Sequence, residues 1–169
     1  PTKRIGVPYH LFADGGIDED VRALFLHTLS ALKEEGFVVR EIELPNLKYS
    51  LPAYYIIMPA EASANLARFD GVRYGTRKEG ANLLGDYEAT RAEGFGAEPR
   101  MRILLGAYVL SAGYYDAYYR QATAVRELIR KEGADAWNEV DLIALPTTPT
   151  PAFKIGEKTE DPLSMYLSD

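Results

Sequence analysis

The first 44 residues follow a pattern of strand, helix and strand that restricts the possible folds. Residues 3–8, KRIGVP, alternate apolar with other side chains and end at a proline, as a short strand can. Asp18 suits the N-cap of a helix that Gly36 would end, and residues 37–44, FVVREIEL, are rich in β-branched side chains. Two strands joined by one helix are typical of a βαβ unit, so the sequence predicts a largely parallel sheet with a right-handed crossover.

Helical spacing dominates the middle of the chain. Residues 53–69, AYYIIMPAEASANLARF, are mostly helix formers, and Pro59 should either kink this helix or begin a second one. Residues 82–93 can form a short helix, and residues 101–137 fit two helices broken at a Ser-Ala-Gly turn. Residues 141–145, DLIAL, predict a last buried strand. The pattern favours one compact α/β unit.

The composition of the chain limits the functions that it can have. The chain has 169 residues, of which 47% are hydrophobic and 26% charged, as in a soluble globular protein. We find no secretory signal and no apolar run of the roughly 18 residues that a membrane span needs. The absence of cysteine and the presence of only two histidines argue against a metal site. A net charge of -6 argues against binding nucleic acid through an overall field, so any RNA contact is expected to fall to a partner.

The residues alone predict no catalytic centre, but they allow a binding site. The serines lie in no nucleophile elbow and in no glycine-rich and serine-rich loop, so no catalytic residue is assigned. A pocket for a free amino acid needs a cation, an anion and usually a hydroxyl. Arg102 begins an apolar stretch in which we expect few helical charge partners, Tyr54 follows closely after a proline, and Asp169 closes the chain. From spacing alone this trio is one possible site.

Several longer segments resemble a known family. Residues 54–75, YYIIMPAEASANLARFDGVRYG, are followed by residues 102–119, RILLGAYVLSAGYYDAYY, then by DLIALPTTPTPAFKIGEK and by DPLSMYLSD. In order and spacing these segments resemble the A subunits of the bacterial tRNA-dependent amidotransferases, within the amidase signature family. The resemblance covers nearly the whole chain. One departure is Ala64, where family members commonly carry a second serine in EASSN.

The resemblance implies a fold and an activity. The fold would be α/β, a mixed sheet flanked by helices, with residues 1–169 forming a single partial amidase-signature domain. The family's catalytic triad of Ser, cis-Ser and Lys would lie N-terminal to Pro1, so this chain alone is expected to hydrolyse no glutamine. The complete subunit would be a cytoplasmic glutaminase that supplies ammonia for making Gln-tRNA(Gln) or Asn-tRNA(Asn).

The resemblance also implies site residues and partners. Tyr54, Arg102 and Asp169 match positions with which the family holds glutamine. Arg102 would pair with the α-carboxylate and Asp169 with the α-ammonium, while the Tyr54 hydroxyl would help to place the ligand. No cofactor is implied for this subunit. The implied partners are a B subunit, which uses ATP and Mg²⁺ and makes most of the tRNA contacts, and a small C subunit.

Two other functions remain compatible with the sequence. The chain could belong to another amidase-signature hydrolase that acts on a different amide. It could also be a non-enzymatic assembly module, in which the tyrosines of residues 114–119 form a protein interface.

Overall fold

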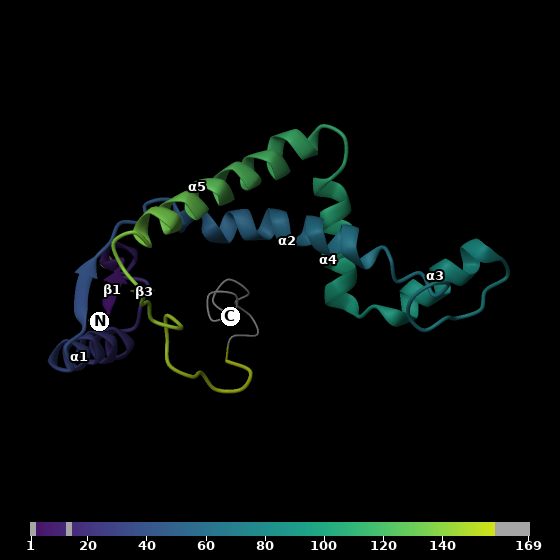
Figure 1. Ribbon diagram of the computed structural model, residues 1–169. Coiled ribbons are helices and arrows are strands. Elements are labelled where there is room, and N and C mark those ends of the chain that lie inside the picture. The colour runs from purple at the N-terminus through teal and green to yellow at the C-terminus, as the bar shows by residue number, and fades with distance from the viewer. Residues whose placement is uncertain (1–2, 13–14, 158–169) are drawn as a thin grey trace. The chain divides into compact units, whose positions relative to one another are not determined.

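The computed structural model describes residues 3–12 and 15–157 (Figure 1). The chain divides into two compact units, one made of residues 1–45 and 130–169 and the other of residues 46–129. The single partial domain that the resemblance implies stays a prediction. In chain order the elements are β1 (Arg4–Val7), α1 (Glu19–Glu34), β2 (Val38–Glu41), α2 (Ser50–Leu66), α3 (Leu83–Gly94), α4 (Ala97–Val109), a π-helical turn (Tyr115–Tyr119), α5 (Arg120–Ala136) and β3 (Leu142–Ile143), with 3-10 turns at Tyr9–Leu11 and Leu47–Tyr49.

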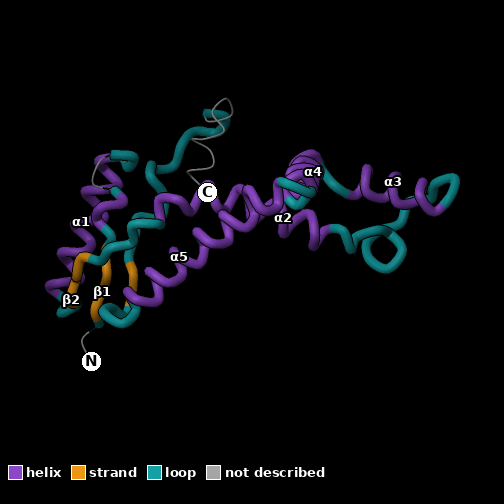
Figure 2. The backbone as a smooth tube through the Cα atoms, turned by 90° about the horizontal axis from the view of Figure 1, so that it is seen from above, coloured by secondary structure: helices purple, strands orange, loops and turns teal. Residues whose placement is uncertain are grey.

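The first unit contains a three-stranded parallel sheet, drawn in orange in Figure 2. Strand β1 lies between β2 and β3, with Ile5 opposite both Val39 and Leu142. Helix α1 connects β1 to β2, so the predicted βαβ unit is confirmed. The two ends of helix α1 are those that the sequence predicts. The Asp18 carboxylate accepts a hydrogen bond from a backbone N–H of the first turn, and Gly36 follows the helix with a φ of +89°.

The core of this unit forms where α1 packs against the sheet. Val7 is fully buried, and Ile5, Phe12 and Leu29 join it. The ring of Phe25, on α1, meets the ring of Phe12 edge-on at a centroid distance of 5.6 Å. Apolar burial of this kind supplies the main driving force for folding, so the two predicted strands and their helix depend on one another.

A single aspartate joins the start of β3 to β1. The Asp141 carboxylate accepts hydrogen bonds from the Arg4 guanidinium at 2.9 Å and from the Arg4 backbone N–H at 2.7 Å. The Asp141 backbone N–H in turn donates to the Arg4 carbonyl at 2.8 Å. These hydrogen bonds lower the pKa of Asp141 from 3.8 to about 2, and the bond from the guanidinium has a larger effect than the bond from the backbone N–H.

This ion pair predicts a pH dependence of stability. Because the folded pKa lies below the unfolded one, the paired Asp141 carboxylate stabilises the fold above about pH 4, and that contribution is lost as the pH falls towards 2. An acid titration followed by carboxyl NMR should find Asp141 near pKa 2. In the Arg4→Met variant the pKa should return towards its ordinary value. An unshifted Asp141 in the unsubstituted protein would contradict the pairing.

The second unit is organised around the packing of α4 on α2. In Figures 1 and 2, α4 runs across α2 rather than along it. Helix α2 is continuous through Pro59, so the proline does not begin a second helix. Both Pro59 and Ala60 are buried, and Gly106 of α4 lies directly against the Pro59 backbone. The small residues of α2 thus allow the close approach of a second backbone, as glycine and alanine generally do.

The segment before α3 is fastened to that helix by two polar side chains. Asp86, on α3, is buried and accepts hydrogen bonds from the Gly80 backbone N–H at 2.6 Å and from the Arg77 guanidinium at 2.5 Å. Both hydrogen bonds lower the pKa of Asp86, and the bond from the Gly80 backbone N–H has the larger effect. The Thr90 hydroxyl accepts from the Lys78 backbone N–H at 2.9 Å. Residues 77–80 are therefore tied to α3 through its Asp86 and Thr90 side chains.

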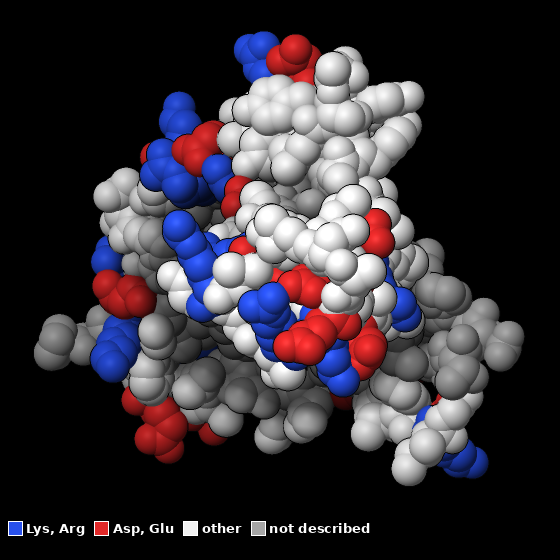
Figure 3. All heavy atoms as spheres, turned by 90° about the vertical axis from the view of Figure 1, so that its right-hand side faces the viewer, with Lys and Arg blue, Asp and Glu red and all other residues white. Residues whose placement is uncertain are grey.

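Figure 3 looks at the side of the chain where α3 lies. Basic and acidic side chains stand next to each other on this face, without a large area of one sign. The pairs Lys78–Glu93, at 2.7 Å, and Arg77–Asp86 are examples. Such mixed charge does not provide the basic stripe that phosphate binding requires.

Within residues 3–12 and 15–157, the helices are all too short or too polar to cross a membrane.

Candidate functional site

The site begins with Tyr54, one turn into α2. Its ring is 48% exposed and stands edge-on to the neighbouring Tyr55 ring. Beside Tyr54 the structure has a cavity of about 300 Å³, at the small end of the range for ligand pockets. The cavity is lined by residues of α2 and α5, namely Ser50, Ala53, Tyr54, Ile57, Met58, Arg126 and Ile129.

Arg102 lies on α4 and faces α2. Its Nε donates to the Glu98 carboxylate at 2.7 Å, and one terminal nitrogen lies 3.5 Å from the Met58 sulfur. The side chain is 22% exposed. The expectation of few helical charge partners is wrong, because α4 begins at Ala97 and not at Met101, which places Glu98 one turn before Arg102.

Met58 lies next to two of the three predicted site residues. It follows Tyr54 by one helical turn, lines the same cavity, and contacts Arg102 with its sulfur. Tyr54 and Arg102, 48 positions apart in the sequence, thus share one neighbour. Asp169, the third predicted residue, lies outside the described residues. The roles of all three stay predictions.

Arg126 also belongs to this cavity, and the sequence does not predict it there. Arg126 lines the cavity from α5, and its one ion pair among the described residues is with the adjacent Glu127, at 3.9 Å. The sequence does contain a signal. Arg126 stands two helical turns after Tyr119, so it should lie on the same face of α5, where Tyr119 makes a contact with α2.

That contact joins the π-helical turn to α2. The Tyr119 hydroxyl donates to the Glu61 carboxylate at 2.8 Å. The hydrogen bond to Glu61 and, next, burial raise the pKa of Tyr119, while the nearby charge of Arg126 lowers it to a smaller extent. Glu61 is also one turn after Met58 on α2. A single face of α2 therefore presents Tyr54, Met58 and Glu61. Met58 contacts Arg102 of α4, and Glu61 contacts Tyr119 of the π-helical turn.

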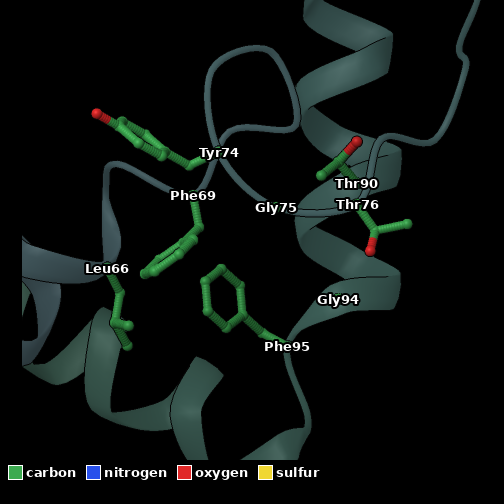
Figure 4. A pocket seen from close by; sticks show the side chains of 8 residues that line it. All are labelled: Leu66, Phe69, Tyr74, Gly75, Thr76, Thr90, Gly94 and Phe95. Carbon is green, nitrogen blue, oxygen red and sulfur yellow. The ribbon is translucent and has the colours of Figure 1, made fainter.

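A second cavity, of about 290 Å³, lies near the end of α2 (Figure 4). Phe69 and Phe95 point into it, whereas Tyr74 points away. Arg91 closes the adjacent helix end by donating to the carbonyls of Leu66 and Phe69, each at 3.1 Å. The lining has no charged residue to bind the ends of an amino acid, since it consists of Leu66, Phe69, Tyr74, Gly75, Thr76, Thr90, Gly94 and Phe95.

Among residues 3–12 and 15–157, histidines and acidic residues nowhere gather in a group of three that could hold a metal ion. The wall of the Tyr54 cavity is instead almost entirely apolar, so Tyr54 and Arg126 line it mainly with their carbon atoms. Such a wall fits the apolar part of a small ligand.

Comparison with known proteins places these features in a family. The family model described as Amidase matches residues 1–169. The chain is 57% identical over 166 residues to the A subunit of glutamyl-tRNA(Gln) amidotransferase from Chloroflexus aggregans, covering 98% of this chain and 34% of that protein. The protein of the same name from Shouchella clausii is 56% identical over 167 residues, with the same two shares covered. This chain therefore spans about a third of the length of the curated relatives it matches.

Two solved structures have a similar fold. The crystal structure of the A subunit of glutamyl-tRNA(Gln) amidotransferase from Thermotoga maritima matches with a TM-score of 0.66 and 36% identity, over 98% of this chain and 31% of that one. A crystal structure of an amidase matches with a TM-score of 0.65 and 27% identity, over 93% of this chain and 30% of the other. The predicted family resemblance and the predicted amidase-signature α/β fold class are confirmed. The chain belongs to the amidase family.

Proposed function

We propose that this chain is part of the glutaminase subunit of a tRNA-dependent amidotransferase. In this function the subunit hydrolyses glutamine, and the ammonia converts Glu-tRNA(Gln) to Gln-tRNA(Gln) or Asp-tRNA(Asn) to Asn-tRNA(Asn). The observation that carries the proposal is the 57% identity, along 98% of the chain, to a protein named as the A subunit of glutamyl-tRNA(Gln) amidotransferase. The matched region includes the segments 54–75 and 102–119, which contain Tyr54 and Arg102.

Within this function the described residues would form one wall of the glutamine pocket. Arg102 would bind the α-carboxylate and the Tyr54 hydroxyl would orient the ligand, with Asp169 binding the α-ammonium. The placement of Tyr54 and Arg102 beside the same methionine supports the first two roles. An arginine fork matches a carboxylate in shape as well as in charge. The bond-breaking groups, Ser, cis-Ser and Lys, would belong to the part of the enzyme that lies outside this chain.

The proposed function includes other subunits. A B subunit would carry the ATP-dependent and Mg²⁺-dependent transfer to tRNA and most of the tRNA contacts, and a small C subunit would complete the complex. No cofactor would be needed for glutamine hydrolysis itself. The net charge of -6 supports leaving the RNA contacts to a partner.

The test is ammonia release by the complete subunit, purified with its partners, from glutamine and from a panel of unrelated amides. We expect glutamine to be hydrolysed and the unrelated amides to be left largely intact. Hydrolysis of another amide in preference to glutamine would assign the chain to a different amidase. Stable assembly without hydrolysis of any amide would favour the assembly module.

A further inference from the structure

We propose that Glu98 is a positioning residue, which holds the Arg102 guanidinium so that its two terminal nitrogens are open to the α-carboxylate of glutamine. The inference rests on the proposed function and on the role given there to Arg102, and it deepens that function by adding a residue and a binding geometry. Glu98 lies in the first turn of α4, one turn before Arg102, and its carboxylate accepts from the Arg102 Nε at 2.7 Å.

The contacts of Arg102 leave part of its guanidinium free. An arginine side chain has five N–H donors, one on Nε and two on each terminal nitrogen. Glu98 takes the donor on Nε, and the Met58 sulfur lies 3.5 Å from Nη1. Within the described part of the chain, Nη2 has no hydrogen-bond partner. The donors that remain for a ligand are therefore on the two terminal nitrogens.

These contacts favour one of the two ways in which an arginine binds a carboxylate through two hydrogen bonds. The planar guanidinium can offer Nε together with one terminal nitrogen, or it can offer both terminal nitrogens. The first arrangement would require an incoming carboxylate to displace Glu98 from Nε. The second requires no such displacement, so the α-carboxylate of glutamine binds Nη1 and Nη2 while Nε stays with Glu98.

Glu98 has two opposing effects on the binding of glutamine. It holds a long side chain in place, so the rotamer freedom of Arg102 is lost on folding and not when glutamine binds. Its negative charge also repels the substrate carboxylate, but the Glu98 side chain is 51% exposed, and water screens this repulsion. Holding the guanidinium is therefore the larger effect, and Glu98 strengthens binding.

The experiment measures ammonia release from glutamine by the complete subunit with its partners. Glu98→Ala should raise the KM for glutamine by about threefold to tenfold, as expected when one long side chain must be ordered on binding, with kcat within about twofold. Glu98→Gln keeps an oxygen that can accept from Nε, so its KM should stay within about twofold of the wild-type value. In an Arg102→Ala background, Glu98→Ala should have no further effect on KM, because Glu98 acts through Arg102.

A crystal structure of the same complex with glutamine tests the binding geometry. We expect the α-carboxylate within hydrogen-bond distance of both Nη1 and Nη2 of Arg102, with Glu98 still on Nε. A carboxylate bound to Nε, with Glu98 displaced, would overturn the proposed geometry.

Glu93→Ala is the matched control. Glu93 is an exposed glutamate on α3 that pairs with Lys78, also at 2.7 Å, and its loss should leave the KM unchanged. An unchanged KM in Glu98→Ala, an equal rise in Glu98→Gln, or a full further rise in the Arg102→Ala background would overturn the positioning role. A wild-type complex that hydrolyses no glutamine would instead overturn the proposed function, and this inference with it.

Discussion

Replacing Gly106 by alanine is expected to lower the free energy of unfolding by about 1 to 3 kcal/mol, and replacing it by valine should cost more. A Cβ atom at this position would lie 2.5 Å from the Pro59 carbonyl carbon and 2.6 Å from the Ser63 Cβ. Real atoms do not approach so closely, so α4 would have to move away from α2. The first neighbour is backbone and cannot rotate aside, which is why the small gain in helix propensity from alanine does not compensate.

Gly133 provides the control for this prediction. It also lies inside a helix, α5, but a Cβ atom there would have open space around it. Gly133→Ala should therefore stabilise the protein, by up to about 1 kcal/mol. Denaturant unfolding of both variants measures the difference. Equal stability changes at the two positions would show that α4 does not pack on α2 as described.

The second large effect is expected at Arg102. In the complete subunit, Arg102→Ala should weaken glutamine binding by about 2 kcal/mol or more, which corresponds to a rise in Kd of about thirtyfold or more. The reason is that the substrate carboxylate would lie in the site without its cation. If Arg102 only formed a helical ion pair with Glu98, the loss would be a few tenths of a kcal/mol of stability, with no effect on glutamine.

Arg100→Ala separates these two explanations. Arg100 is an exposed arginine on the same helix, two positions before Arg102, and it lines a different cavity. Calorimetric titration with glutamine should find wild-type affinity in this variant and a large loss in Arg102→Ala. Unchanged binding by Arg102→Ala would remove Arg102 from the site.

The βαβ unit can be predicted because its signals are local. Asp18 accepts the N-cap hydrogen bond that its side chain suits, and Gly36 adopts the positive φ that glycine tolerates. Asn82 similarly caps α3 by accepting from the Gly85 N–H at 3.0 Å. Such short-range preferences fix where an element begins and ends without reference to the rest of the chain.

The parts that cannot be predicted depend on contacts between distant segments. Pro59 stays inside one helix, a position that propensity alone disfavours, and the packing of α4 on α2 buries it there. The apolar pattern places the start of α4 four residues late, because Gly96 and Pro99 resemble the end of a loop. Proline is in fact tolerated in a first helical turn, and the earlier start gives Arg102 its partner.

The same difference between local and long-range signals applies to the candidate site. Tyr54 and Arg102 are identified through a family resemblance, and the structure places both beside Met58. Arg126 has no local signature of binding. Its position depends on the π-helical turn and on the bond between Tyr119 and Glu61, which join segments 58 residues apart. Sequence spacing can indicate a shared helix face, but not which other helix that face meets.

We propose that Tyr54 and Arg102 bind the glutamine from which the complete subunit would take ammonia. A crystal structure of the complete subunit with bound glutamine tests this binding most directly. We predict that the α-carboxylate lies within hydrogen-bond distance of the Arg102 guanidinium and that the Tyr54 hydroxyl contacts the ligand. Glutamine bound with neither side chain in contact would contradict the account.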